Sequence, residues 1–157
     1  MSTPMVQAIL AGKKTMTRRV VQARTPYQVG DRLWVRETWQ HNPFGGIVYK
    51  AGSGIVNCDG RGWRPSIFMP RWASRITLEI TNVRVERLQE ITEADARSEG
   101  AQPALWFQPT KHEDDDYSLS PSGKISYKNG FANIWQRING KKYPWANNPW
   151  VWVIEFK

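Results

Sequence analysis

The feature that most constrains the fold is a long run of alternating apolar and polar residues at positions 75–87. The alternation slips by one residue near Thr81 and Asn82. A period of two is typical of a half-buried β-strand, and a slip in its phase indicates a bulge or a break. We therefore expect one long bent strand, or a pair of strands, in this segment.

Further short strands are expected where β-branched and aromatic residues stand between turn residues. These segments are 15–22, 32–39, 47–50 and 150–156. In the second of them, alternation places Arg32, Trp34, Arg36 and Thr38 on one face. That polar, basic face is consistent with the wall of a ligand site and equally with the outer face of a barrel.

Three helices are predicted, at 4–11, 93–99 and 131–140. The first begins at a proline, the second has Thr92 as its N-cap, and the third has apolar residues at helical spacing. Residues 101–130 lack a regular pattern, so we expect a mobile surface excursion there. The expected core comprises Ile9, Leu10, Leu33, Val35, Ile76, Leu78, Phe131, Trp135 and Val153.

Strands with a few short helices predict an α+β fold built around a small, partly closed β-barrel. A chain of 157 residues is most simply one domain with a real core. It has no apolar run long enough to span a bilayer, no signal-peptide pattern and a single cysteine. These features favour a cytoplasmic location and no membrane partner.

The excess positive charge is concentrated in residues 12–36, which hold seven Lys or Arg residues and one acid. A cluster of one sign attracts anions, and nucleic-acid phosphate is the usual partner. The motif within this cluster is Gly12-Lys13-Lys14-Thr15-Met16-Thr17-Arg18-Arg19. One interpretation is a basic loop in which Lys13, Lys14, Arg18 and Arg19 bind phosphate.

The other interpretation of this motif is a reacting centre. Neighbouring cations lower the pKa of a lysine, which makes Lys14 a usable base near neutral pH. Thr17 is the hydroxyl that it would activate, although on an ideal strand the two side chains point to opposite faces. Their pairing therefore requires a turn or bulge after Gly12.

Glu99 is a second candidate, because it falls in the last turn of the helix predicted at 93–99. The helix dipole disfavours a carboxylate at this end of a helix. A residue type that local structure disfavours at its position is a candidate for a functional role. An exposed glutamate at a helix end is the ordinary alternative.

Nine tryptophans are many for this length. They are expected to fill the core, but a tryptophan beside positive charge also provides a stacking surface for a nucleobase. Trp34 and Trp39 lie nearest Arg32 and Arg36 in the sequence and are the better candidates for stacking.

No metal or cofactor is expected from the sequence. One cysteine and two histidines give no zinc-ligand spacing, and no phosphate-binding glycine motif is present. The acidic run at 113–116 lacks the spacing of a calcium loop and is expected to be a solvated surface segment.

Taken in order, these motifs resemble the ASCH family, a PUA-like β-barrel group associated with RNA. The resemblance is carried by residues 12–18, the Val29-Gly30-Asp31 turn, residues 88–100 and the final strand. Residues 34–39 and 71–76 resemble members common in phage and prophage genomes. The resemblance implies a single PUA-like domain over 1–157, with insertions at 40–70 and 101–130.

Small bacterial members of this family include an amidohydrolase that removes acetate from N4-acetylcytidine. The resemblance implies that Lys14 acts as base, Thr17 as nucleophile and Glu99 as the group that handles the leaving-group proton. Trp34, Trp39 or Arg36 would then contact the substrate, a modified nucleoside or RNA. If these three residues form a working site, Thr17 should lie within hydrogen-bond reach of Lys14, and Glu99 should open onto the same pocket.

Other relatives are reported to bind nucleic acid or to cut RNA. A non-catalytic RNA-binding module and a metal-independent RNA-cleaving one are therefore the alternatives, and both would use the same basic cluster.

Overall fold

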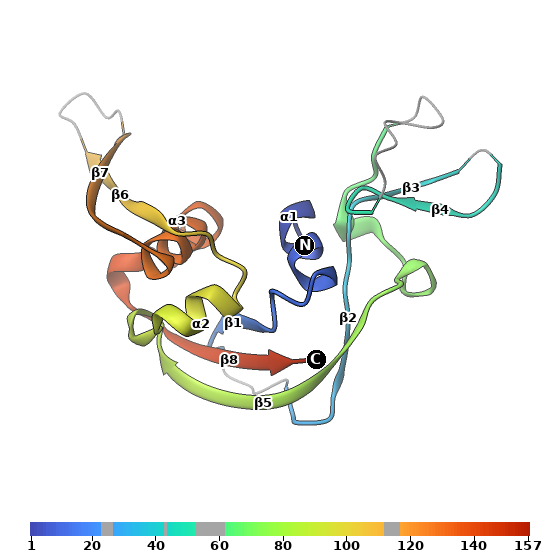
Figure 1. Ribbon diagram of the computed structural model, residues 1–157, viewed down its shortest axis with the longest axis horizontal. Helices are drawn as coiled ribbons and strands as arrows, with labels where there is room; N and C mark the ends of the chain where they lie inside the picture. Colours follow the sequence, from blue (N-terminus) through green and yellow to red (C-terminus); the bar gives the residue numbers. More distant parts are fainter. Residues whose placement is uncertain (23–26, 43, 53–61, 112–116) are drawn as a thin grey trace.

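The computed structural model describes residues 1–157 apart from 23–26, 43, 53–61 and 112–116. Its described helices and strands form a mixed α+β fold (Figure 1). The helices are α1 (Thr3–Leu10), α2 (Glu93–Ser98) and α3 (Tyr127–Asn139), with short 3-10 turns at Ser66–Phe68, Arg71–Ala73, Leu88–Glu90 and Trp145–Asn147. The strands are β1 (Met16–Val20), β2 (Arg32–Trp34), β3 (Trp39–His41), β4 (Ile47–Tyr49), β5 (Thr77–Arg87), β6 (Ala104–Lys111), β7 (Tyr117–Ser126) and β8 (Trp150–Phe156).

The centre of the fold is a four-stranded antiparallel sheet with strand order β1-β8-β5-β2, curled into a half-barrel (Figure 1). Strand β5 is long enough to pair with β2 near its start and with β8 along most of its length. Its register with β8 shifts between Ile80 and Asn82. This confirms the bulge predicted from the slip in alternation, and it shows one bent strand rather than two.

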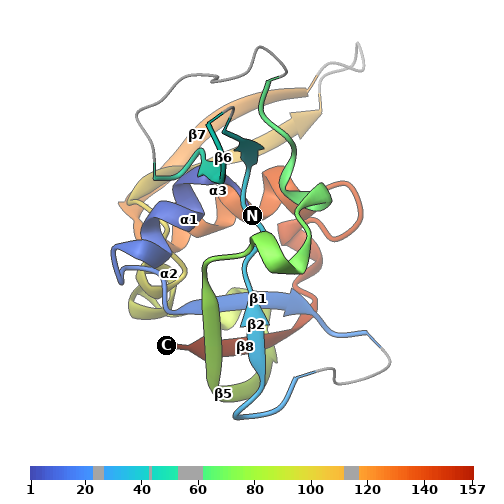
Figure 2. The same cartoon turned by 90° about the vertical axis from the view of Figure 1, so that its right-hand side faces the viewer.

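The sheet has a core cluster on each face. Met16 of β1 and Val153 of β8 pack with Phe131 and Trp135 of α3 on one face. On the other, Val6 of α1 packs with Val35 and with strands β5 and β8. Both views place α1 beside α2 and the start of β1 (Figure 2).

Six members of the predicted core are buried, and Ile9 and Leu33 are half-buried against it. The buried six are Val35, Ile76, Leu78, Phe131, Trp135 and Val153. The prediction was wrong for Leu10, which is 50% exposed. Leu10 is the last residue of α1, and the C-cap that follows it, Ala11, is also exposed.

The strand predicted at 32–39 is interrupted. Its first part, β2, pairs with β5, whereas its last residue begins β3, which pairs with β4 in a separate sheet. Between them Glu37 is buried, and the Arg75 guanidinium donates to both of its carboxylate oxygens, at 2.9 and 3.0 Å. The chain thus leaves the central sheet next to this buried ion pair.

The lack of regular structure predicted for residues 101–130 was also wrong over most of that segment. Strands β6 and β7 pair with each other as a two-stranded antiparallel sheet at the opposite end of the molecule from β3 and β4 (Figure 1). Helix α3 begins at Tyr127, before the predicted position 131, because the Ser126 side chain accepts from the Asn129 N–H as an N-cap. The acidic run at 113–116 lies outside the described residues.

The remaining predicted elements are present within a few residues of their expected ends. Thr92 caps α2 by accepting from the Asp95 N–H at 3.0 Å, and β8 has the predicted limits. None of the helices in the described ranges is long and apolar enough to cross a membrane.

Helix α3 lies against the backbone at Gln102, and Gly130 permits this close approach. A Cβ atom at Gly130 would lie 1.8 Å from the Gln102 carbonyl oxygen. Helix propensity alone favours alanine over glycine by about 1 kcal/mol. We predict the opposite outcome for Gly130→Ala, a loss of about 2 kcal/mol in the free energy of unfolding, because backbone must move.

Urea unfolding of Gly130→Ala measures this change. Arg137→Ala, at an exposed position of the same helix, is the control and should change stability little. A Gly130→Ala protein more stable than the wild type would contradict the close approach.

Candidate active site

The basic loop is held against the end of α2 by backbone hydrogen bonds. After α1 ends, Gly12 adopts a φ of +65°, and the N–H groups of Lys13 and Lys14 both donate to the Ala8 carbonyl oxygen. The Thr15 N–H then donates to the Ser98 carbonyl oxygen at 2.9 Å. The loop after α1 is thereby joined to the C-terminal end of α2.

Lys14 and Glu99 form a buried ion pair at this junction. Each side chain is about 5% exposed, and Lys14 Nζ lies 2.7 Å from Glu99 Oε2. The same ammonium donates to the carbonyl oxygens of Glu99 and Met16, also at 2.7 Å. All three N–H bonds of the lysine are therefore used.

Burial is the main reason why the pKa of Lys14 lies below its ordinary value of 10.5. Glu99 opposes this effect by its charge and its hydrogen bond, and the cations Arg19 and Arg18 add to it. The direction agrees with the expectation from sequence, but desolvation contributes more than the neighbouring cations.

Arg18 is held in a network of carboxylates on the α2 side of β1. Its side chain is fully buried, with Asp95 at 2.9 Å and Glu99 at 3.4 Å, and it also pairs with Glu86. Arg84 extends this network by pairing with Asp95, with Glu86 and with Glu155. Arg18 thus connects Glu99 to Asp95 and Glu86 and is not available to bind a ligand.

Thr17 lies on the opposite face of β1 from Arg18, as strand alternation requires. It lines a cavity of about 360 Å³ together with Arg19, Trp34, Arg36 and residues of β5 and β8. The Thr17 hydroxyl accepts from the Arg19 guanidinium at 3.2 Å. The expected hydrogen bond between Lys14 and Thr17 is not formed among the described residues.

Trp34 and Arg36 share one wall of this cavity, with the guanidinium carbon of Arg36 5.0 Å from the centre of the Trp34 ring. Trp39 lies elsewhere. It is only 2% exposed and packs with Met69 and Ala73 in a separate core cluster, so its ring is not on the cavity wall.

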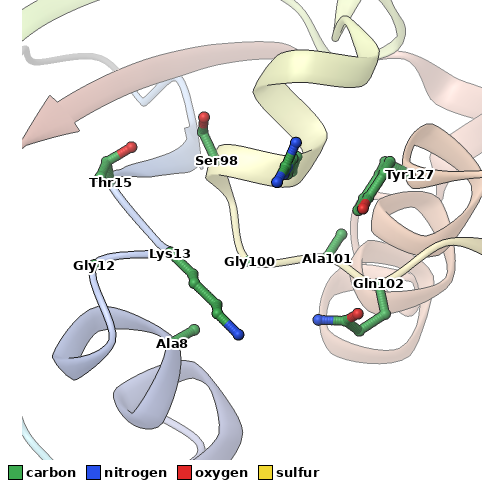
Figure 3. A pocket seen from close by; sticks show the side chains of 10 residues that line it. Ala8, Gly12, Lys13, Thr15, Ser98, Gly100, Ala101, Gln102 and Tyr127 are labelled. Carbon is green, nitrogen blue, oxygen red and sulfur yellow. The ribbon is translucent and has the colours of Figure 1, made fainter.

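Lys13 lines a second cavity of about 400 Å³, between α1, the end of α2 and the start of α3 (Figure 3). Arg97, Gln102 and Tyr127 also line it, and sequence reasoning identified none of them. The sequence could have indicated Arg97, because it is a cation in the last turn of the predicted helix, two residues before Glu99. It could not have indicated Tyr127, because α3 begins before its predicted start.

The structure thus brings Lys14 together with Glu99, and Thr17 together with Arg19, Trp34 and Arg36. Glu99 is enclosed rather than on the wall of the Thr17 cavity, in contrast to the expectation. Within the described residues, no group of three or more His, Cys, Asp or Glu side chains is arranged to hold a metal ion.

Comparison with family models, with curated proteins and with solved structures gives no match for this chain.

The lowered pKa of Lys14 makes a prediction for stability at alkaline pH. Between the folded-state pKa and 10.5, the unfolded chain holds a proton on Lys14 that the folded protein has released, so folding becomes more favourable as pH rises. The comparison protein is Lys14→Met/Glu99→Gln, which removes both charges. We expect wild-type stability to rise relative to it by at most about 1.4 kcal/mol per pH unit in this window.

Urea unfolding across the alkaline range measures the difference between the two proteins. If the stability of the wild type relative to the double variant stays constant, or falls, as pH approaches 10.5, then Lys14 keeps an ordinary or raised pKa in the folded state.

Proposed function

We propose that this protein is an amidohydrolase that removes the acyl group from the N4 nitrogen of an acylated cytidine. The observation that carries the proposal is the buried Lys14–Glu99 ion pair, three residues along the chain from a threonine that lines a cavity. A buried lysine with a lowered pKa is a usable base, and a threonine hydroxyl needs one to become a nucleophile. The resemblance to the ASCH family supports the same assignment of roles.

The cavity suits a single nucleoside. Its volume of about 360 Å³ falls in the range of small-molecule sites, and it combines apolar residues with a few polar groups. The Trp34 ring offers a stacking face for the pyrimidine, and Arg36 above it is placed to orient the ligand. The acyl group then lies toward Thr17.

In the proposed reaction, Lys14 first passes a proton to the Glu99 carboxylate, giving a neutral amine and a carboxylic acid. The Lys14 amine takes the Thr17 hydroxyl proton as Oγ attacks the acyl carbon, and the negative charge moves to the former carbonyl oxygen. The C–N4 bond then breaks, and the Glu99 acid gives its proton to the leaving nitrogen. Water hydrolyses the acyl ester of Thr17, releasing the carboxylic acid and restoring the hydroxyl.

This sequence requires movement of two side chains, because the enclosed Glu99 must open toward the Thr17 cavity to reach the leaving nitrogen and Lys14 must turn toward Thr17. Lys14 Nζ donates to the Met16 carbonyl oxygen in the resting structure and must turn from it to reach Thr17. Loss of the ammonium charge weakens that hydrogen bond, so proton transfer to Glu99 and rotation of the amine support each other. Arg19 meanwhile holds the Thr17 hydroxyl and is placed to stabilise negative charge that develops beside it.

A module that binds RNA through its phosphates fits the geometry less well. Of the four cations expected to bind phosphate, Lys14 and Arg18 are buried and paired with carboxylates, and only Lys13 and Arg19 are exposed. The response to salt separates the two functions. Binding through several phosphates weakens steeply as salt rises, whereas binding of one neutral nucleoside does not.

The direct test is incubation with N4-acetylcytidine and chromatography of the products. We expect wild-type protein to release cytidine and Thr17→Val to be slower by about a hundredfold or more, because it lacks the nucleophile. The matched control is Thr81→Val, an exposed threonine of β5 that lines neither of the two cavities, which should retain activity. No cytidine release above that of Lys14→Ala would remove the proposal.

The role of Trp34 makes a separate prediction about substrate binding. Stacking of a base on an aromatic ring contributes about 1–3 kcal/mol, so Trp34→Ala should raise KM by about tenfold or more with a smaller effect on kcat. Trp72→Ala, which removes a tryptophan that is 71% exposed, is the control. Equal kinetic effects of the two substitutions would place the base elsewhere.

A further inference from the structure

The cavity that Lys13 lines is a second candidate binding site, outside the groups assigned to catalysis. The Lys13 side chain extends into it from the loop after α1, and the Gln102 amide points toward the Lys13 amine from across the space (Figure 3). The Tyr127 hydroxyl is directed into the same space from the start of α3 (Figure 3). Arg97 of α2 completes the set of donors.

The charge of this cavity is positive and not neutralised. Lys13 and Arg97 are exposed, and neither makes a salt bridge within the described part of the chain. Its lining residues include no Asp or Glu. The neighbouring cations Lys14 and Arg18 are, in contrast, paired with carboxylates. Two free cations beside uncharged donors form a site for an anion with several acceptor oxygens.

The linings of the two cavities include residues only two apart in sequence, at the start of β1. Thr15 lines the Lys13 cavity and Thr17 lines the other. Thr15 continues the pairing of β1 with β8, because its carbonyl oxygen accepts from the Phe156 N–H at 2.9 Å. Residues two apart in an extended strand point to the same side and are separated by about 7 Å. That separation is similar to the span between a nucleoside and its own phosphate.

We propose that the Lys13 cavity binds a phosphate group of the substrate while its base occupies the Thr17 cavity. Lys13 and Arg97 neutralise the phosphate, and Tyr127 and Gln102 donate to its remaining oxygens. A nucleotide or an RNA chain then binds more tightly than the free nucleoside, whose base and acyl group occupy the Thr17 cavity alone. This inference rests on the proposed function for the position of the base, but not for the binding of phosphate.

The test measures binding rather than turnover, by calorimetry with four unmodified probes. These are cytidine, cytidine 5′-monophosphate, a short single-stranded oligocytidylate and inorganic phosphate. The Lys13→Gln/Arg97→Gln protein is compared with the wild type. The matched control is Arg137→Gln/Lys141→Gln, which removes one arginine and one lysine at exposed positions near the other end of α3.

We expect at least one phosphorylated probe to bind the wild type about tenfold or more tightly than cytidine does. This advantage should disappear in Lys13→Gln/Arg97→Gln and persist in the control. Preference for the monophosphate or for the oligonucleotide then identifies the source of the phosphate. Equal affinities for cytidine and both phosphorylated probes, or equal losses in the two double variants, would overturn the proposal.

The same measurements separate this inference from the proposed function. Tight phosphate binding in a protein that leaves N4-acetylcytidine intact would retain the phosphate site and remove the amidohydrolase. Deacetylation that is unaffected by phosphate and by the Lys13 and Arg97 substitutions would instead retain the amidohydrolase and remove the phosphate site.

Discussion

The ion pair between Lys14 and Glu99 is the interaction on which the arrangement of the site depends. It joins the loop after α1 to the C-terminal end of α2, and it closes a contact across 85 residues of sequence. Burying two charges is costly unless both are paired and hydrogen-bonded. Lys14 meets this condition with three hydrogen bonds, and Glu99 accepts from Arg18 as well as from Lys14.

The same network separates structural cations from those that are free to meet a ligand. Arg18 and Arg84 are bound to the carboxylates between β1, β5 and α2, and Arg18 also pairs with Glu99. Arg19 faces the Thr17 cavity and Lys13 faces the cavity beside α1. The basic motif is therefore divided into a buried, paired set, Lys14 and Arg18, and a ligand-facing set, Lys13 and Arg19.

Local signals predicted much of the fold. The slip at Thr81 and Asn82 predicted the bulge, and Thr92 predicted the start of α2. The hairpin of β6 and β7 was missed because its strands contain Ser, Pro and Gly and, among the described strands, pair with no others. The contact of Lys14 with Glu99 follows from no periodicity in the chain, and the ASCH resemblance alone indicated it. The surroundings of Trp39 depend on a separate small sheet, which the sequence did not indicate.

The central claim is that Lys14, Glu99 and Thr17 act on one substrate although the resting structure keeps Thr17 apart from the pair. A crystal structure of Thr17→Val with N4-acetylcytidine tests this most directly. We predict the pyrimidine against Trp34, the acyl carbon about 3–3.5 Å from the side chain of residue 17, and the Lys14 amine turned away from the Met16 carbonyl oxygen. A ligand bound outside this cavity, or an empty cavity at saturating ligand, would contradict the account.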